Sequence, residues 1–233
     1  MVEAGRLFIA LSGADKYETL LSHVGPDPKD LSLFLPNVIP RLPALIRNSI
    51  ALCLRVFFKD SVFSRLFVNI HGRTVKDYWA ETVSRDKYRR LFYNQVWEAH
   101  GFDGLICPVN ALPVIGHGTT RDLSVLGFAT GVYNVVDHPV GIVPVTRVDK
   151  AKDTLSDTWR ESGVKGSSLM YGKIYEQREP LYDATKMHGI PVAVQVVGRS
   201  WEDEKVIEMM KVVDAALGDR DFGPGAWGRK HSC

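Results

Sequence analysis

The sequence predicts an α/β fold in which a sheet is flanked by helices and a hydrophobic helical segment forms a cap. Three short apolar runs, at residues 104–109, 141–148 and 191–198, have the length of buried strands and are bounded by Gly or Pro. Segments with the apolar spacing of helices alternate with these runs, as in proteins that pack helices against a sheet. The 233 residues contain no internal repeat and no low-complexity segment, so one such unit accounts for the chain.

Composition excludes several classes of function. The hydrophobic share of 45% and the net charge of +2 are ordinary for a folded protein, and no nucleic-acid partner is expected without a basic excess. Cys53, Cys107 and Cys233 form no CxxC pair, which favours a reducing compartment and no zinc site. The chain lacks HExxH, Walker and GxGxxG motifs, so neither a metal nor another cofactor is expected. Residues 1–12 lack the pattern of a signal peptide, and an intracellular location is predicted.

The N-terminal half contains three expected elements. Residues 5–21 have helical spacing, and a turn-rich connector with two prolines follows at residues 25–30. Residues 31–70 are the most apolar part of the chain and are divided by prolines into short elements. A long helix is predicted over residues 75–100, and Gly101 is a suitable stop for it.

The C-terminal half alternates strands with less regular segments. After the second strand, residues 149–173 are polar and are expected to be irregular. A helix interrupted by Pro180 is expected at residues 175–186. The last helix is predicted over residues 201–217, with acidic residues in its first turn, and a tail follows.

Three segments, in this order, resemble the C-terminal region of amidase-signature enzymes. They are DGLICP at residues 103–108, YNVVDHPVGIVPVT at 133–146 and GIPVAVQVVGRSWEDEKVIEMM at 189–210. The resemblance implies a partial amidase domain, with a mixed sheet flanked by helices at 101–217, a hydrophobic helical cap at 31–70 and a tail at 218–233. Taken singly, each strand is equally typical of ordinary sheet scaffolding.

The resemblance also indicates which chemistry is missing from the chain. Amidase-signature enzymes use a Ser-Ser-Lys set carried by a Gly- and Ser-rich segment, which lies N-terminal to everything matched here. The one Gly-Ser-Ser of this sequence, Gly166 to Ser168 beside Lys165, falls between the second and third matched strands and is interpreted as a solvated loop. No catalytic residue is therefore expected, and the chain alone is predicted to be inactive.

The cap carries the strongest functional signal. Along residues 42–59, wound as a helix, apolar side chains share one broad face and basic side chains gather opposite, which is typical of a helix lying in a bilayer interface. Fatty-acid amide hydrolases of this family have a membrane-binding cap at the matching place. The side chains expected to contact the membrane are Leu42, Ile46, Ile50, Arg47, Arg55 and Lys59. An amphipathic helix packed on a core is the alternative.

The resemblance further implies a path for the acyl chain of a lipid-like amide substrate. By match, Thr130 and Trp201 border it, joined by Phe63 and Phe67 from the cap; Trp201 could instead simply pack over the sheet edge. The predicted function is the C-terminal portion of a hydrolase of fatty acid amides or related amides, associated peripherally with a membrane, and a homodimer is one arrangement open to it. A non-catalytic lipid or membrane-surface binding module and an amidase of small amides are the alternatives.

Overall fold

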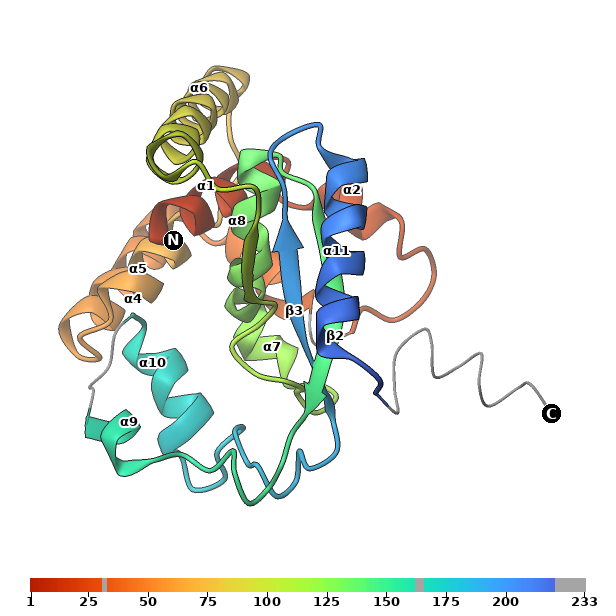
Figure 1. Cartoon of the computed structure of the whole chain (residues 1–233). Coiled ribbons are helices and arrows are strands. Elements are labelled where there is room, and N and C mark those ends of the chain that lie inside the picture. Colours follow the sequence, from red (N-terminus) through yellow and green to blue (C-terminus); the bar gives the residue numbers. More distant parts are fainter. Residues whose placement is uncertain (31–32, 162–165, 221–233) are drawn as a thin grey trace.

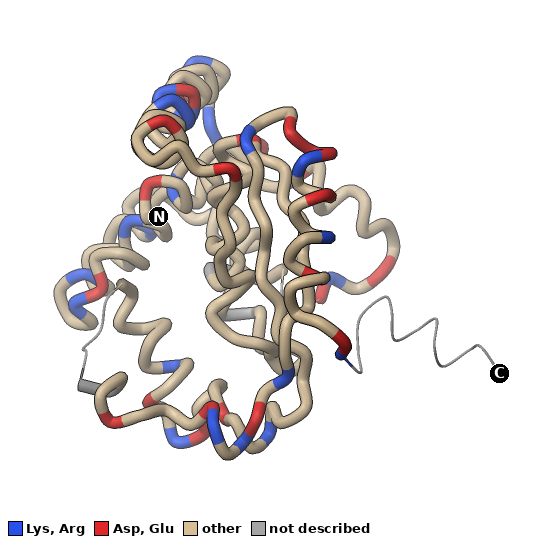
Figure 2. Tube along the Cα trace, in the orientation of Figure 1, with Lys and Arg blue, Asp and Glu red and all other residues tan. Residues whose placement is uncertain are grey.

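The computed structural model describes residues 1–30, 33–161 and 166–220. A small sheet lies at the centre, with helix α11 (Asp203–Leu217) on one face and α8 (Phe128–Val136) on the other (Figure 1). Helices α1 (Val2–Ser12) and α6 (Val75–Phe92) cover α8. Charged residues are concentrated on α6, α11 and the connections, while the strands and α8 are almost free of them (Figure 2).

The sheet contains β1 (Leu105–Pro108), β2 (Val140–Arg147) and β3 (Pro191–Val197), in the order β1-β3-β2. These strands confirm the three apolar runs of the sequence. Both outer strands are antiparallel to β3, so among the described residues the sheet is antiparallel, and the expectation of a mixed sheet is wrong for this part of the protein. The β1 and β2 strands run in the same direction on either side of β3, with α8 in the connection between them, which explains why the sequence alternates strands and helices.

Close packing fixes the position of α11 on the sheet. A Cβ atom built on Gly141 of β2 would lie 1.9 Å from the Met210 sulfur, so the Met210 side chain occupies the space that the missing side chain of Gly141 leaves open. Val206, in the first turns of the same helix, is buried against the sheet. The predicted helix at residues 201–217 is thus confirmed with a start two residues later.

Two helix predictions are wrong in detail. Residues 5–21 form α1 and a separate short helix, α2 (Glu18–Ser22), because Lys16 and Tyr17 adopt left-handed backbone conformations between them. The helix expected at residues 175–186 is absent. Only its first two residues are helical, as the end of the π-turn η5 (Gly172–Glu176), and bends flank Pro180, which cannot supply a helical amide. Helix α10 (Ser168–Tyr171) lies before η5, within the segment 149–173 that was expected to be irregular.

The remaining elements surround this core. The long helix expected at residues 75–100 is α6 continued by a π-turn, which confirms it. The cap forms around a cluster of Ile39, Ala51 and Phe67. The other helical elements are α3 (Phe34–Val38), η2 (Ile39–Arg41), α4 (Ala44–Val56), α5 (Ser61–Val68), η3 (Tyr93–Glu98), α7 (Thr120–Leu123), η4 (Ser124–Gly127) and α9 (Asp157–Glu161).

A buried hydrogen bond joins the long helical segment to the start of β2. The Trp97 Nε1–H group donates to Nε2 of His138 over 2.7 Å, and the two rings are stacked with centroids 5.7 Å apart. The other imidazole nitrogen, Nδ1, lies 2.8 Å from the Val136 carbonyl oxygen and donates to it. Nε2 must therefore be unprotonated, and the ring is neutral. Burial lowers the pKa of His138, in agreement with this geometry.

The His138 geometry predicts acid sensitivity. Because the folded-state pKa lies below the unfolded one, the stabilising effect is fully present above the unfolded pKa and is lost as the pH falls toward the folded value. The free energy of unfolding should therefore decrease as the pH falls below about 6.5, the ordinary pKa of histidine. In urea titrations, His138→Gln should flatten this dependence, whereas His100→Gln, at an exposed position, should retain it. An unchanged slope in His138→Gln would contradict the assignment.

Candidate functional site

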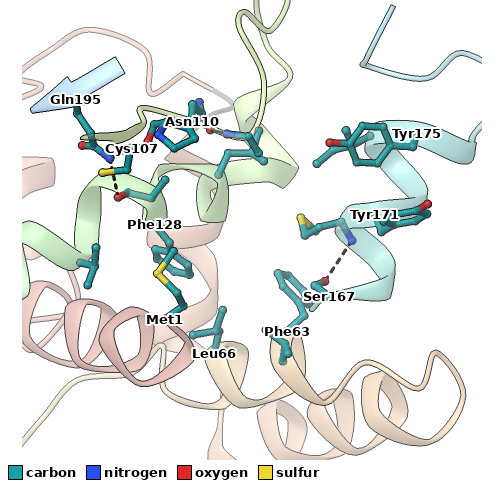
Figure 3. A pocket seen from close by; sticks show the side chains of 18 of the residues that line it. Met1, Phe63, Leu66, Cys107, Asn110, Phe128, Ser167, Tyr171, Tyr175 and Gln195 are labelled. Carbon is teal, nitrogen blue, oxygen red and sulfur yellow. Dashed lines mark hydrogen bonds between the residues drawn. The ribbon is translucent and has the colours of Figure 1, made fainter. Parts of the chain in front are cut away.

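A cavity of about 630 Å³ lies between the cap, the sheet and residues 168–176, which comprise α10 and η5 and are called the α10 segment. Cap helix α5 supplies Phe63 and Leu66 on one side, and the α10 segment supplies Tyr171 and Tyr175 on another (Figure 3). The third wall comes from β1, β3 and α8. The lining residues from this wall are Cys107, Pro108, Phe128, Ala129, Val132, Tyr133 and Gln195. The surface of the cavity is predominantly apolar, so it suits a hydrocarbon chain better than a charged ligand.

Polar side chains gather at the end of the cavity formed by β1 and β3. The Tyr133 hydroxyl lies 3.0 Å from the Cys107 sulfur, and burial raises the Tyr133 pKa, so the phenol stays neutral. Gln195 Nε2 donates to the carbonyl oxygens of Pro108 and Ala129, over 2.8 and 3.1 Å. These bonds tie β3 to β1 and to α8. This end of the pocket is therefore held rigidly by uncharged groups.

The cap is joined to the α10 segment by one buried carboxylate. Asp60 is fully buried and caps α5 by accepting from the Phe63 amide over 2.7 Å. Its other oxygen accepts from the Ser167 hydroxyl over 2.5 Å and from the Leu169 amide over 3.0 Å. Three donors thus satisfy the carboxylate, as a buried charge requires. The bond to Ser167 crosses 107 residues of sequence and places two walls of the cavity relative to each other.

The hydrogen bonds of Ser167 serve the fold. Its hydroxyl donates to Asp60 and also accepts from the Met170 amide over 3.2 Å, which caps α10. The neighbouring Ser168 hydroxyl donates to the Phe58 carbonyl oxygen over 2.8 Å. The donor and acceptor functions of the Ser167 hydroxyl are thus both used, in stabilising the Asp60 carboxylate and in capping α10. Lys165 lies outside the described residues.

The four predicted acyl-path residues do not come together. Phe63 lines the cavity, whereas Phe67 is buried in the cap cluster behind it. Thr130 is not among the lining residues, and its hydroxyl donates to the Gly127 carbonyl oxygen over 2.8 Å. Trp201 is 86% exposed beside a smaller cavity that includes His138. The sequence prediction missed Met170 and Tyr171 because it treated their polar surroundings as irregular; their spacing with Ile174 and Tyr175 was the available signal.

Helix α4 presents its apolar residues to the outside. Leu45 and Phe57 are 79% and 78% exposed. We call this face the cap surface; its apolar members are Leu45, Ile46, Ile50, Leu52, Val56, Phe57 and Phe58. Arg55 and Lys59 are exposed near its C-terminal end.

Arg47 is buried, although the sequence predicted that it would face the membrane. Arg47 is only 8% exposed and donates to the Leu42 carbonyl oxygen over 3.2 Å, because it lies on the side of α4 that faces the rest of the cap. Leu42 packs, partly buried, against the cap cluster. Ile46 and Ile50 are exposed, as the sequence prediction required. Two of the three predicted cations, Arg55 and Lys59, thus lie on the surface.

In residues 1–30, 33–161 and 166–220, no helix combines the length and apolarity needed to cross a bilayer. Likewise, no group of three or more His, Cys, Asp or Glu side chains in them is arranged to hold a metal ion.

Comparison with known proteins gives a consistent picture. The family model described as Amidase matches residues 55–207, more than half of the chain. The chain is 30% identical over 155 residues to an acetamidase of Aspergillus oryzae, covering 64% of this chain and 26% of that protein. It is 28% identical over 186 residues to fatty-acid amide hydrolase 1 of Sus scrofa, covering 77% and 29%. The chain therefore spans between a quarter and a third of these relatives.

A solved structure of a fatty acid amide hydrolase shares part of the fold. The TM-score is 0.53 at 18% sequence identity, and the match covers 78% of this chain and 33% of that one. At this identity the likeness concerns the fold alone.

The Asp60 geometry predicts a large stability effect. Asp60→Ala leaves three donors without their acceptor and should lower the free energy of unfolding by about 3 kcal/mol, against about 1 kcal/mol for Ser167→Ala. The double variant should lose less than the sum, because the two residues share a hydrogen bond. Urea denaturation measures all three. Additive losses would show that the bond between cap and α10 contributes little.

Proposed function

Because the chain belongs to the amidase family, we propose that it is the C-terminal portion of an amidase-signature hydrolase that acts on fatty acid amides or related amides. In this proposal the chain supplies the acyl-binding pocket and a membrane-facing cap, and the Ser-Ser-Lys set belongs to another part of the complete enzyme. The observation that carries the proposal is the apolar cavity of about 630 Å³ directly beneath the cap.

The apolar walls favour a lipid amide over a small one. Each buried methylene contributes about 0.8 kcal/mol, so a long acyl chain gains on the order of 10 kcal/mol before the costs of ordering it are subtracted. An acetamide-sized substrate would gain almost nothing from Phe63, Leu66 and Phe128. Uncharged groups at the β1 end, including Tyr133 and Gln195, are compatible with a neutral amide rather than a free carboxylate.

The cap surface supports a peripheral association with membranes. Seven large apolar side chains are exposed on and just after α4, and Arg55 and Lys59 lie beside them. Apolar side chains that enter the acyl boundary, with basic side chains at the level of the headgroups, form the pattern of an interfacial helix. Phe63 and Leu66, on the neighbouring α5, line the pocket, so a lipid leaving the bilayer would have a short path into it. An intracellular membrane surface is the proposed location.

A non-catalytic lipid-binding module is the second candidate. It is favoured by one observation, that Ser167, within the one Gly-Ser-Ser of the chain, is engaged with Asp60. Such a module would use the same pocket and cap surface but would have no catalytic partner segment. Activity of a longer protein that includes an upstream Gly- and Ser-rich segment separates the two candidates.

Membrane binding should depend on the cap surface. Each basic residue near an anionic bilayer contributes about 1 kcal/mol, so Arg55→Glu and Lys59→Glu should each lower partitioning onto phosphatidylserine-containing vesicles at least about fivefold. Leu45→Asp and Phe57→Asp should lower it further, including onto neutral vesicles. Vesicle sedimentation measures these effects. Lys152→Glu, an exposed substitution distant in sequence from the cap, is the matched control. Partitioning indifferent to salt and to all four changes would refute the cap proposal.

The acyl pocket should set chain-length preference in the complete enzyme. Ala129 lines the cavity, and Ala129→Leu reduces its volume. The kcat/KM for a long-chain fatty acid amide should fall about tenfold or more, since several methylenes lose their place, while a short amide is affected little. Ala80→Leu, on the exposed face of α6, is the control. Equal losses for both substrates would assign Ala129 to the fold rather than to the pocket.

A fluorophosphonate probe, which labels an activated serine, tests whether the nucleophile lies outside this chain. The longer protein should be labelled and the 233-residue chain should not. Labelling of this chain at Ser167 or Ser168, with turnover, would overturn the proposal and make the chain a self-contained hydrolase.

A further inference from the structure

An aromatic cluster lies where α9 packs against the α10 segment. The rings of Trp159 and Tyr171 are nearly parallel, at 4°, with centroids 5.5 Å apart. Tyr175 is inclined to both, with its centroid 4.4 Å from Trp159 and 5.2 Å from Tyr171. Tyr182 extends the cluster on the far side of Tyr175, at 6.0 Å. The three rings of Trp159, Tyr171 and Tyr175 are called the aromatic triad below.

The aromatic triad borders a cavity that the proposed function leaves unassigned. This cavity has a volume of about 430 Å³ and is lined by Leu155, the triad and Glu176. Tyr171 and Tyr175 also line the acyl pocket, so they form the wall between the two cavities. Glu176 is exposed and places a carboxylate at the edge of the aromatic surface.

Aromatic faces beside a carboxylate bind one class of ligand well. The quadrupole of an indole or phenol ring attracts a cation placed over its face, and tryptophan does so most strongly. Burial raises the pKa values of Tyr175 and Tyr182, so these rings keep their neutral hydroxyls. Glu176 then adds an ordinary charge attraction to that of the rings.

We propose that the cavity beside the aromatic triad binds a quaternary ammonium group, with Trp159 and Tyr175 facing the cation and Glu176 balancing its charge. A primary ammonium has three N–H donors that lose water on entry, and a lining of rings with a single carboxylate replaces few of those bonds. A quaternary ammonium has no donor to satisfy and a large apolar surface, which suits this lining. The cavity is spacious enough for a trimethylammonium group with its substituent.

Two sources could supply this group, a soluble choline-type cation or the headgroup of a phosphocholine lipid. The site lies near the cap, since the Ser168 hydroxyl at the start of α10 donates to the Phe58 carbonyl oxygen over 2.8 Å. Phe58 belongs to the cap surface. A headgroup of a bilayer that contacts the cap surface is therefore within the neighbourhood of the triad, and in that form the inference would extend the proposed membrane contact.

The test compares choline with its neutral isostere, 3,3-dimethylbutan-1-ol, by isothermal titration calorimetry on the 233-residue chain. Choline should bind saturably and about three- to thirtyfold more tightly than the isostere, the range that cation–π attraction supplies. Trp159→Leu should abolish this preference, and Glu176→Gln should reduce it severalfold. Trp79→Leu, an exposed tryptophan on α6, should leave it unchanged.

Three results would overturn the assignment: no saturable choline binding, equal binding of the isostere, or a preference that survives both Trp159→Leu and Glu176→Gln. Because Trp159→Leu removes packing, its thermal unfolding is recorded, and Glu176→Gln, at an exposed position, carries the test if the first variant unfolds. Weaker partitioning of Trp159→Leu than of the unsubstituted chain onto phosphatidylcholine vesicles would identify the lipid headgroup as the source, and equal partitioning of the two would identify a soluble cation. None of these measurements requires amide hydrolysis or an anionic membrane, so they fail or succeed independently of the proposed function.

Discussion

The candidate site depends on the hydrogen bonds that the buried Asp60 carboxylate accepts. A fully buried charge is tolerated only when hydrogen bonds replace the water it has lost, and here the donors come from two separate parts of the chain. One donor is the Phe63 amide in the first turn of α5. The others are the Ser167 hydroxyl and the Leu169 amide at the start of α10. If either part moved, the carboxylate would lose donors that no solvent could replace. The electrostatic requirement of one side chain therefore fixes the cap on the α10 segment.

This constraint explains why a cavity persists between the parts. The connection from β2 through α9 and α10 leaves the sheet and returns to it along β3, and the start of α10 lies next to the cap (Figure 1). Walls supplied by α5, α8 and α10 are thereby held apart at fixed positions instead of collapsing together. Clusters on either side, such as Leu112 with Leu123 and Ile39 with Phe67, give each wall its own packing. The pocket is thus a consequence of tertiary connections rather than of any one helix.

Local patterns in the sequence predicted the local structure well and the site poorly. The three strands were predictable because runs of four to eight apolar residues bounded by Gly or Pro are typical of buried strands. Helices α6 and α11 were predictable from the helical spacing of their apolar residues. Helix α8 was missed, since it is only nine residues long and contains a glycine and three β-branched valines, residue types with low helix propensity. The pairing of Asp60 with Ser167 could not be predicted, because the two residues are 107 positions apart and the sequence indicates only that Asp60 can cap a helix. Antiparallel pairing was equally hidden, since alternation of strands and helices does not specify which strands become neighbours.

The apolar face of α4 is turned away from the rest of the protein. Hydrophobic patterning predicts an amphipathic helix, and the ordinary outcome is that its apolar face packs inward. Here Arg47 and Ala51 face inward while Leu45 and Leu52 face outward. The cap does not need the outward face for its own folding, because Ile39, Ala51 and Phe67 already form a cluster with α5. An apolar surface of this kind exposed to water is unfavourable by roughly 25 cal/mol per Å², so a protein that keeps it gains when another apolar phase covers it. A bilayer with anionic headgroups fits both the apolar side chains and the neighbouring Arg55 and Lys59, and the same contact would bring lipid to the residues of α5 that line the pocket.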